Sequence, residues 1–282
     1  MADKPRVWDA FLTREFIYIP QADDNKYTRG VVGLVAGSKR FPGAAILAAR
    51  ASLATGVGMV RFVGTPALNA MVLAAAPSVV VTPGRVDAWV LGPGVGPMTP
   101  ADPNMVFRHR AMTLAYEDRL PTVLDAGGLM TPEKFHPLTL LTPHSAELST
   151  LLGSRGISVS PSDIADSPLH WARRAAETLR TTVLLKGART CVASPEKVIE
   201  LPLATAWLAT AGTGDVLAGV IGALTATHAK ALVEHPEYFA DIAASGAFIH
   251  AAAAERASQG GPLTAESLVK ELPDAIRLIL AR

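Results

Sequence analysis

Short apolar runs recur along the chain and alternate with Ala-rich stretches of helical composition. Residues 31–36 read VVGLVA, residues 88–91 read AWVL, and residues 182–186 read TVLLK. Strands that are apolar at every position are typical of parallel sheets, because helices cover both faces of such a sheet. Further strands are predicted at 59–63, 78–82, 122–124 and 138–141. The pattern predicts an α/β fold in three layers, with a mostly parallel central sheet between helices.

The segments between and after these strands are expected to be helical or irregular. Helices are predicted at 44–55, 66–76, within 101–118, at 168–180 with Ser167 as N-cap, and in the Ala-rich C-terminal part. Short strands at 190–193 and 198–201 are expected to form an antiparallel edge. The first 29 residues are mixed and polar, and are expected to be irregular. With no repeat or linker in view, we expect a lead-in at 1–24 and a single domain at 25–282.

The composition restricts the partners of the chain. Of 282 residues, 49% are hydrophobic and 18% are charged, and the net charge of +1 comes without any block of like charges. Binding to nucleic acid or to anionic membranes therefore gets no electrostatic support from the sequence. An uncharged stretch at 62–84 is interrupted by three prolines, which favours strand, helix and strand over a membrane span. A single cysteine, Cys191, allows no internal disulfide, and the first twenty residues lack the apolar segment of a secretory signal peptide. Both features favour the cytoplasm.

Six loops of small and polar residues are expected to follow predicted strands. They are GSKRFPGAA at 37–45, GPGVG at 92–96, DAGG at 125–128, TPHSAE at 142–147, KGART at 186–190 and AGTGD at 211–215. Ligands of open α/β sheets bind beyond the carboxyl ends of the strands, so these loops are expected to converge on one crevice. Each also has a purely structural interpretation. Asp125 is a possible helix cap, Thr142 with Pro143 a possible N-cap pair, and His144 and Lys186 possible surface residues.

The sequence AGTGD is the most informative of these loops. Gly212, Thr213 and Gly214 leave backbone N–H groups uncovered at the start of a long apolar helix, and such donors bind phosphate. Asp215 then lies in or near the first helical turn, where it would repel that phosphate unless it has a task. A task that fits is to take a proton from a hydroxyl that attacks a phosphoryl group. The alternative is an acidic residue that merely favours the helix dipole.

Two common nucleotide-binding motifs are missing. The Walker A pattern G-x-x-x-x-G-K-[ST] does not occur, and GPGVGP at 92–97 has Pro97 where G-x-G-x-x-G requires its last glycine. The second absence argues against a dinucleotide site of the Rossmann type. An anion site at AGTGD is thus the phosphate-binding feature that the sequence supports.

Five segments in fixed order resemble the NAD(P)H-hydrate dehydratase family of the ribokinase-like superfamily. They are VAGSKRFPGAAILAARASLATGVGMVRF, LGPGVG, LTPHSAEL, LLKGART and GTGDVLAGVIGAL. The resemblance covers roughly residues 25–282 and is to the stand-alone dehydratases. It implies a lyase that repairs nicotinamide cofactors: the hydrate of NADH or NADPH is phosphorylated on its hydroxyl by ADP (ATP in eukaryotes) and loses phosphate. The expected products are NAD(P)H, AMP and phosphate, with Mg²⁺ bridging the nucleotide phosphates.

The resemblance also implies roles for individual residues. Asp215 is the base and touches both ligands. The nucleotide-binding positions are Lys186, Gly187, Ala188, Arg189, Thr190, Gly212, Thr213 and Gly214, and the hydrate-binding positions are Ala45, Gly96 and His144. Glu147 is expected to orient His144 or a metal-bound water. The family commonly has DADAL where this chain has DAGGL, so Gly127 replaces a second acidic residue, and PHPGE is replaced by PHSAE.

Two other functions remain open at this point. A ribokinase-like kinase for a vitamin precursor alcohol, of thiazole or pyrimidine type, shares GTGD but does not explain TPHSAE, PGAA and GPGVG together. A nucleotide-binding regulator without catalysis does not explain a carboxylate at Asp215. The resemblance further implies a homotetramer and cooperation with a separate NAD(P)H-hydrate epimerase, with hydrated NADH and hydrated NADPH both as candidate substrates.

Overall fold

The computed structural model describes residues 5–282, which contain a nine-stranded sheet of order β1-β9-β8-β7-β6-β5-β4-β2-β3. The strands are β1 (Arg6–Val7), β2 (Val31–Val35), β3 (Met59–Phe62), β4 (Ala88–Leu91), β5 (Thr122–Leu124), β6 (Thr139–Leu141), β7 (Thr182–Leu185), β8 (Cys191–Ala193) and β9 (Val198–Glu200). Strand β8 is antiparallel to both of its neighbours, and every other pair is parallel. The predicted α/β class is confirmed.

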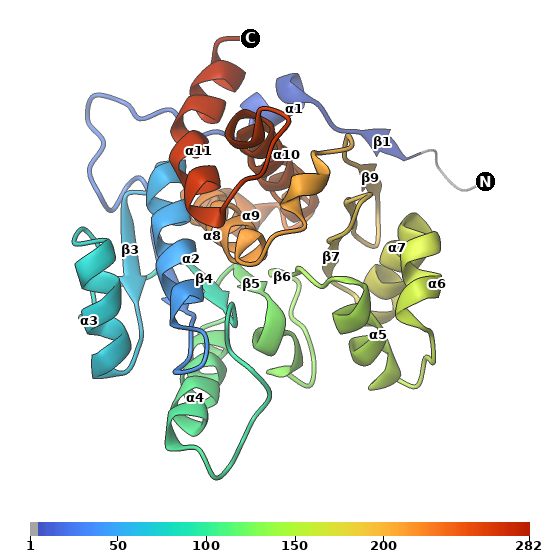
Figure 1. Ribbon diagram of the computed structural model, residues 1–282, viewed down its shortest axis with the longest axis horizontal. Helices are drawn as coiled ribbons and strands as arrows, with labels where there is room; N and C mark the ends of the chain where they lie inside the picture. The colour runs from blue at the N-terminus through green and yellow to red at the C-terminus, as the bar shows by residue number, and fades with distance from the viewer. Residues whose placement is uncertain (1–4) are drawn as a thin grey trace.

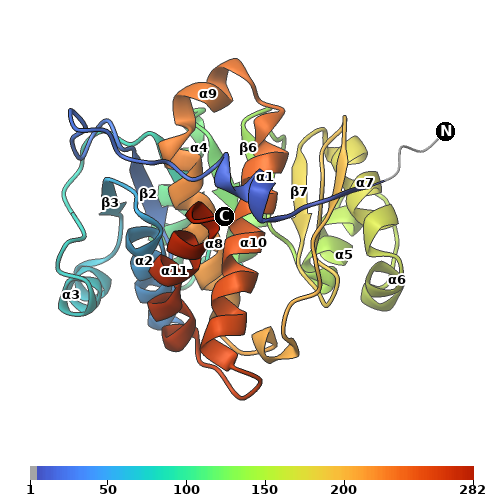
Figure 2. The same cartoon turned by 90° about the horizontal axis from the view of Figure 1, so that it is seen from above.

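Helices cover both faces of this sheet (Figures 1 and 2). They are α1 (Ala10–Arg14), α2 (Pro42–Thr55), α3 (Pro66–Ala75), α4 (Pro103–Glu117), α5 (Ser145–Gly153), α6 (Pro161–Asp166), α7 (Pro168–Leu179), α8 (Thr213–Thr227), α9 (Ala229–Glu234), α10 (Tyr238–Ser258) and α11 (Ala265–Leu280), with 3₁₀ turns η1 (Ala126–Met130) and η2 (Ala206–Leu208). Helices α2, α8, α10 and α11 pack together on one face, and α4 to α7 lie on the other.

The strands β2, β4, β5, β6 and β7 are buried at every position, because helices cover both faces of the sheet. In β2, Val32 and Leu34 belong to the core under α2, α8 and α10, whereas Val35 belongs to the core under α4, α5 and α7. Burial of both faces removes the alternation of polar and apolar residues that a half-exposed strand shows. In the part of the chain that the structure describes, no helix combines the length and the hydropathy needed to cross a bilayer.

Two local predictions are corrected. Residues 78–82 form no strand, since only Val80 makes a bridge, to Arg61. Two N-terminal elements, β1 and α1, lie where an irregular lead-in was expected; Trp8 between them is 1% exposed and donates its indole N–H to Thr13. Burial of one large aromatic side chain holds this polar segment against the sheet. Residues 1–4 of the lead-in lie outside the described part.

Two further details concern the edge of the sheet and helix α7. The antiparallel arrangement predicted for 190–193 and 198–201 is confirmed, but β1 adds a parallel strand outside β9, so β9 is not the edge. Helix α7 begins with Pro168 after Ser167 as predicted, although the Ser167 side chain makes no capping hydrogen bond.

Candidate active site

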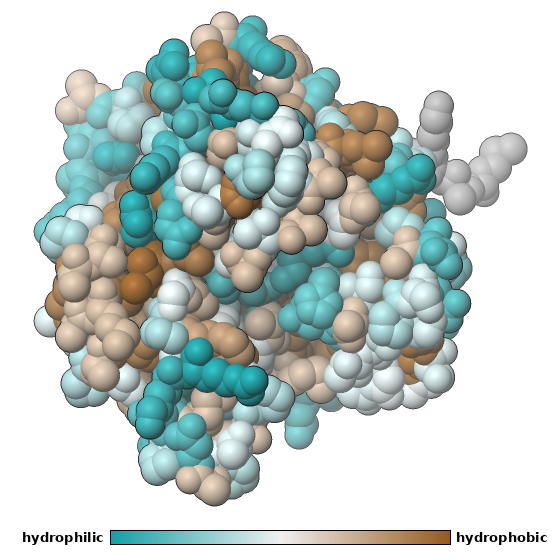
Figure 3. All heavy atoms as spheres, viewed as in Figure 1, coloured by the Kyte–Doolittle hydropathy of each residue, from teal (hydrophilic) through white to brown (hydrophobic). Residues whose placement is uncertain are grey.

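Loops from the carboxyl ends of the parallel strands meet at one edge of the sheet. The Gly37 N–H donates to the Pro93 carbonyl at 2.7 Å, which joins the loop after β2 to the loop after β4. A Cβ added at Gly94 would lie 2.3 Å from the Ala44 Cβ, so the GPGVG loop rests on the start of α2, where Ala45 lies. Figure 3 shows hydrophilic residues lining a depression on the face that Figure 1 presents, between α8 and α11 on one side and α4 and α5 on the other.

Gly127 allows the loop after β5 to pack directly on the GPGVG loop. A Cβ added at Gly127 would lie 2.3 Å from the Val95 carbonyl oxygen and 3.1 Å from that of Gly96. Cβ atoms do not approach backbone oxygens this closely, so an aspartate here would force the two loops apart. Glycine, and not the second acidic residue that the resemblance implies, therefore fits the close contact between these loops. Asp125 supplies the carboxylate of this segment alone.

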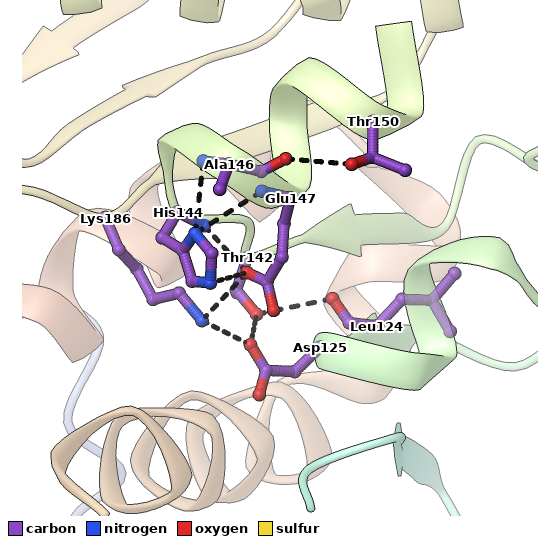
Figure 4. A network of polar contacts seen from close by, with 8 residues as sticks. All are labelled: Leu124, Asp125, Thr142, His144, Ala146, Glu147, Thr150 and Lys186. Atoms are coloured by element: carbon purple, nitrogen blue, oxygen red, sulfur yellow. Dashed lines mark hydrogen bonds and ion pairs between the residues drawn. The ribbon is translucent and has the colours of Figure 1, made fainter. Parts of the chain in front are cut away.

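Lys186, at the end of β7, is the centre of a buried polar network (Figure 4). Its Nζ lies 2.6 Å from Oδ1 of Asp125 and 3.7 Å from Oε2 of Glu147. The Thr142 hydroxyl donates to the same Asp125 oxygen at 2.8 Å. Burial alone would lower the pKa of Lys186, but the charges of Asp125, Glu147 and Asp215 raise it, so the side chain is an ammonium ion.

This network answers the structural alternatives raised for these residues. Asp125 stands before η1 without capping it, and its carboxylate binds Lys186 and Thr142 instead. Thr142 is not an N-cap, because α5 begins after His144. Lys186 is paired rather than solvated. The ion pair joins residues 61 positions apart, and the one sequence signal for it is that both residues directly follow apolar strands.

His144 is the N-cap of α5 and closes a capping box with Glu147. Its Nδ1 accepts hydrogen bonds from the N–H groups of Ala146 and Glu147 at 3.2 and 3.3 Å. The Glu147 carboxylate accepts from the His144 N–H at 2.8 Å. Since Nδ1 accepts, the hydrogen of the neutral ring lies on Nε2, 3.5 Å from Oε2 of Glu147. Glu147 thus orients His144, as expected, and the ring keeps one donor beside the Lys186 network.

The nucleotide-binding loop expected at 186–190 connects β7 to β8. The Lys186 N–H donates to the Pro143 carbonyl at 2.8 Å, which joins this loop to the TPHSAE segment. Gly187, Ala188 and Arg189 are exposed. The Thr190 hydroxyl donates to the Gly187 carbonyl at 3.2 Å. The loop is thus closed on itself and presents its middle residues to solvent.

Helix α8 begins with free backbone donors. Gly212 has φ +91°, a left-handed conformation that favours glycine, and no side chain caps the helix. Within residues 5–282, the N–H groups of Gly212, Gly214 and Asp215 have no hydrogen-bond partner. The Thr213 N–H makes a long bond to Thr210 O at 3.4 Å, and its hydroxyl shares its one hydrogen between the carbonyls of Leu208 and Thr210. Gly212 and Gly214 therefore fit the predicted anion site better than Thr213 does.

The AGTGD loop differs from the other five in its origin. It follows η2 and not a strand, because β9 ends at Glu200. Its position is set by α8, which lies on the sheet and directs its first turn towards the end of β7. A Cβ added at Gly214 would lie 3.8 Å from the Lys186 Nζ. The anion site and the Lys186 network thus belong to one site.

Asp215 is the third residue of α8 and is half-buried. Burial and the charge of Asp125 raise its pKa to about 7, and Lys186 opposes this increase. A carboxylate with a pKa near neutrality is suited to proton transfer at physiological pH. The structure therefore provides, side by side, an uncapped helix start, a lysine ammonium ion and a carboxylate able to accept a proton.

The pH dependence of catalysis is expected to follow Asp215. Only its deprotonated form can accept a proton, so kcat/KM should fall as pH drops through about 7. Asp125→Asn removes a negative charge that raises the Asp215 pKa, and should move this acidic limb to lower pH. Lys186→Gln removes a positive charge that lowers it, and should move the limb to higher pH. Profiles of kcat/KM against pH for the three proteins check this, and an unchanged limb in both variants would contradict it.

Comparisons with known proteins point to one family. The family model described as NAD(P)H-hydrate dehydratase matches residues 32–274. The ADP-dependent (S)-NAD(P)H-hydrate dehydratase of Neisseria meningitidis is 32% identical over 278 residues, which cover 92% of this chain and 88% of that protein. The bifunctional NAD(P)H-hydrate repair enzyme Nnr of Mycobacterium leprae is 38% identical over 278 residues, covering 93% of this chain and 53% of that protein.

A solved structure shares the fold over the whole chain. The ADP/ATP-dependent NAD(P)H-hydrate dehydratase of Bacillus subtilis, co-crystallized with ATP/Mg²⁺, has a TM-score of 0.82 at 25% identity, covering 99% of this chain and 100% of that one. The chain spans about half the length of the Nnr relatives that it matches.

Proposed function

This chain belongs to the NAD(P)H-hydrate dehydratase family, and on that premise we propose that it dehydrates hydrated NADH or NADPH with ADP as co-substrate. The observation that carries the proposal is the position of Asp215 in the first turn of α8, beside an uncapped helix start. Its pKa of about 7 allows the carboxylate to accept a proton there. A protein that only binds nucleotide has no use for such a group. Repair of a nicotinamide cofactor, with release of AMP and phosphate, requires such a group to take the proton of the attacking hydroxyl.

The first step is a phosphoryl transfer. Asp215 takes the proton of the hydroxyl on the hydrated ring, and that oxygen attacks the terminal phosphorus of ADP while the bond to AMP breaks. The N–H groups of Gly212 and Gly214 and the ammonium of Lys186 stabilise the negative charge on the transferring group. Their distribution around Asp215 explains why a carboxylate is tolerated beside phosphate. The repulsion is offset by donors already in place.

The second step is an elimination. Hydroxide is a poor leaving group, and the phosphorylated oxygen is a good one. The lone pair of the ring nitrogen expels phosphate as the carbon–oxygen bond breaks, and loss of a proton from the neighbouring carbon forms the double bond. The net change is removal of one water from the hydrate, with its oxygen found in the phosphate product. A kinase-like site thus supports a lyase reaction.

Binding roles follow from the placement of the loops. We assign the nucleotide to Gly214 and the segment 186–190, and the hydrate to Ala45, Gly96 and His144, with Asp215 between them. The hydrate positions lie at the start of α2, in the loop after β4 and at the N-cap of α5, and the nucleotide positions lie at the end of β7 and the start of α8.

Mg²⁺ fits this donor set as an ion held mainly by the nucleotide. Within residues 5–282, no group of three or more His, Cys, Asp or Glu side chains could hold a metal. Asp125 and Glu147 offer carboxylate oxygens beside Lys186, and magnesium commonly combines one or two carboxylates with phosphate oxygens and water. When bound, the ion would neutralise phosphate charge.

Turnover of the hydrate tests the proposal directly. The purified chain, given hydrated NADH with ADP and Mg²⁺, should restore the absorbance of the dihydronicotinamide band and release AMP. Failure to do so, together with phosphorylation of a thiazole or pyrimidine alcohol, would favour the vitamin kinase. Nucleotide binding without turnover of either substrate would favour the regulator. The same assay with hydrated NADPH and with ATP defines the preferred substrates.

Substitutions at His144 should separate its capping role from its substrate role. His144→Asn keeps a good N-cap, whereas His144→Ala loses it and should cost about 1 kcal/mol of stability. Both lose the Nε2 donor, so both should raise KM for the hydrate by about 10-fold while the affinity for ADP stays the same. Thermal unfolding, hydrate kinetics and ADP titration check this. If His144→Asn kept native hydrate kinetics, the ring would have no contact with the hydrate.

Two proposals concern partners. We propose that this chain cooperates with a separate NAD(P)H-hydrate epimerase that supplies the substrate isomer, because the Nnr relatives are bifunctional repair enzymes. We also propose a homotetramer and a single catalytic domain over 25–282. Light scattering after size exclusion measures the assembly, and racemic hydrate consumed to completion only with added epimerase would support the first proposal.

A further inference from the structure

His250, in the middle of α10, makes a buried contact with the start of α8. It is 7% exposed, and its Nε2 lies 2.9 Å from the carbonyl oxygen of Thr213, the first residue of α8. A carbonyl can only accept, so Nε2 carries the hydrogen and donates it. The two helices pack against each other on one face of the sheet. His250 is 37 positions from its acceptor, and no sequence motif considered above includes it.

His250 is uncharged at the pH of the cell. Burial lowers its pKa to about 4; the bond to Thr213 opposes this, and the charge of Lys186 adds to it. The charge of the Lys186 ammonium therefore acts on the His250 ring and lowers its pKa. A neutral imidazole is a fixed donor, and its contact with Thr213 does not change over the pH range in which Asp215 titrates.

The geometry of one peptide group connects His250 to the anion site. The Thr213 carbonyl and the Gly214 N–H belong to the same planar peptide unit and point in opposite directions. The carbonyl is held by His250, and the Gly214 N–H has no partner within residues 5–282. We propose that His250 is a positioning residue for phosphate binding, which fixes and polarises this peptide so that the Gly214 N–H faces the transferring phosphoryl group.

The local sequence explains why such a support is needed. The peptide joins Thr213 to Gly214 and follows Gly212, which is in the left-handed region; glycines on both sides of Thr213 give this stretch unusual backbone freedom. A hydrogen bond at the carbonyl increases the donor strength of the N–H in the same peptide, because bonds in series polarise one another. His250 acts through Thr213 and does not touch either substrate. The inference rests on the proposed nucleotide site.

Three variants test the proposal. Calorimetry in the absence of the hydrate measures how tightly each variant binds ADP and adenosine. His250→Leu keeps the volume and removes the donor, and His250→Asn holds its amide one methylene too short. His250→Gln places an amide nitrogen as many bonds from the backbone as Nε2. We expect His250→Leu and His250→Asn to weaken ADP binding by about 5- to 10-fold, the effect of one lost hydrogen bond. Gln should restore it, and adenosine affinity should change little in all three.

Several results would overturn the assignment. One is a native affinity for ADP in His250→Leu. Another is an equal loss of affinity for ADP and for adenosine. The third is an affinity for ADP in His250→Gln that is as low as in His250→Asn. If Leu does not fold, the Asn and Gln pair still decides, since they differ by one methylene. Thermal unfolding of each variant measures any loss of stability. Because ADP binding is measured without the hydrate, failure of the dehydratase proposal leaves this test intact, and loss of ADP binding in the native chain would reject both.

Discussion

Asp215→Asn should lower kcat for the hydrate by about 10²- to 10⁴-fold, the range for removal of a general base. Asn keeps the shape of the side chain but cannot accept the hydroxyl proton. The start of α8 loses a negative charge, so the affinity for ADP should be equal or higher. Steady-state kinetics and ADP titration measure the two effects separately. Loss of turnover with retained binding is the signature of a base.

Glu266→Gln provides a matched control. Glu266 also lies in the first turn of a helix, α11, but it is exposed and outside the site network. The control should keep native kcat and native ADP affinity. An Asp215→Asn variant that turned over hydrate at the native rate would remove Asp215 from the mechanism and leave only its interaction with the helix dipole.

Lys186→Met should destabilise the protein and abolish tight ADP binding. It removes the cation from a largely buried pair and leaves Asp125 uncompensated, which costs about 3 kcal/mol in such pairs. It also removes the positive charge opposite the α8 anion site. Chemical denaturation measures the free energy of unfolding, and calorimetry measures ADP binding.

The double variant Asp125→Asn with Lys186→Met separates these two effects. Neutralising Asp125 removes the uncompensated charge, so a large part of the lost stability should return. ADP binding should not return, because the lysine is still missing. Recovery of both would mean that Lys186 serves the fold alone, and recovery of neither would mean that the lost stability does not come from an uncompensated charge on Asp125.

Local features of the site were predictable because neighbours in the chain determine them. The apolar run after Gly-Thr-Gly predicts a helix whose first N–H groups are free, and α8 begins at Thr213 with those groups free at Gly214 and Asp215. Five of the six loops follow strands as predicted, since parallel strands end at one edge, whereas the AGTGD loop follows η2. Errors occurred where a local signal was weak, at 78–82 and in the polar segment that holds Trp8.

Long-range contacts of the site were beyond local reasoning. The roles of Asp125 and Thr142 depend on Lys186, and the contact of His250 depends on the packing of α10 against α8. Ionisation is equally non-local, because the pKa of Asp215 depends on burial and on the charges of Asp125 and Lys186. None of these terms can be read from the residues next to the group concerned.

The amino-acid sequence by itself determined the α/β class, the strand-end loops and the family, because these follow from periodicity, small residues and ordered motifs within short stretches of chain. Only the tertiary structure decided which side chains meet: the pairing of Lys186 with Asp125, the tautomer of His144 and the support of Thr213 by His250. The physical reason is the distance along the chain over which each interaction acts. Backbone propensity acts over a few residues, whereas desolvation, charge and hydrogen bonding act between groups that folding brings together.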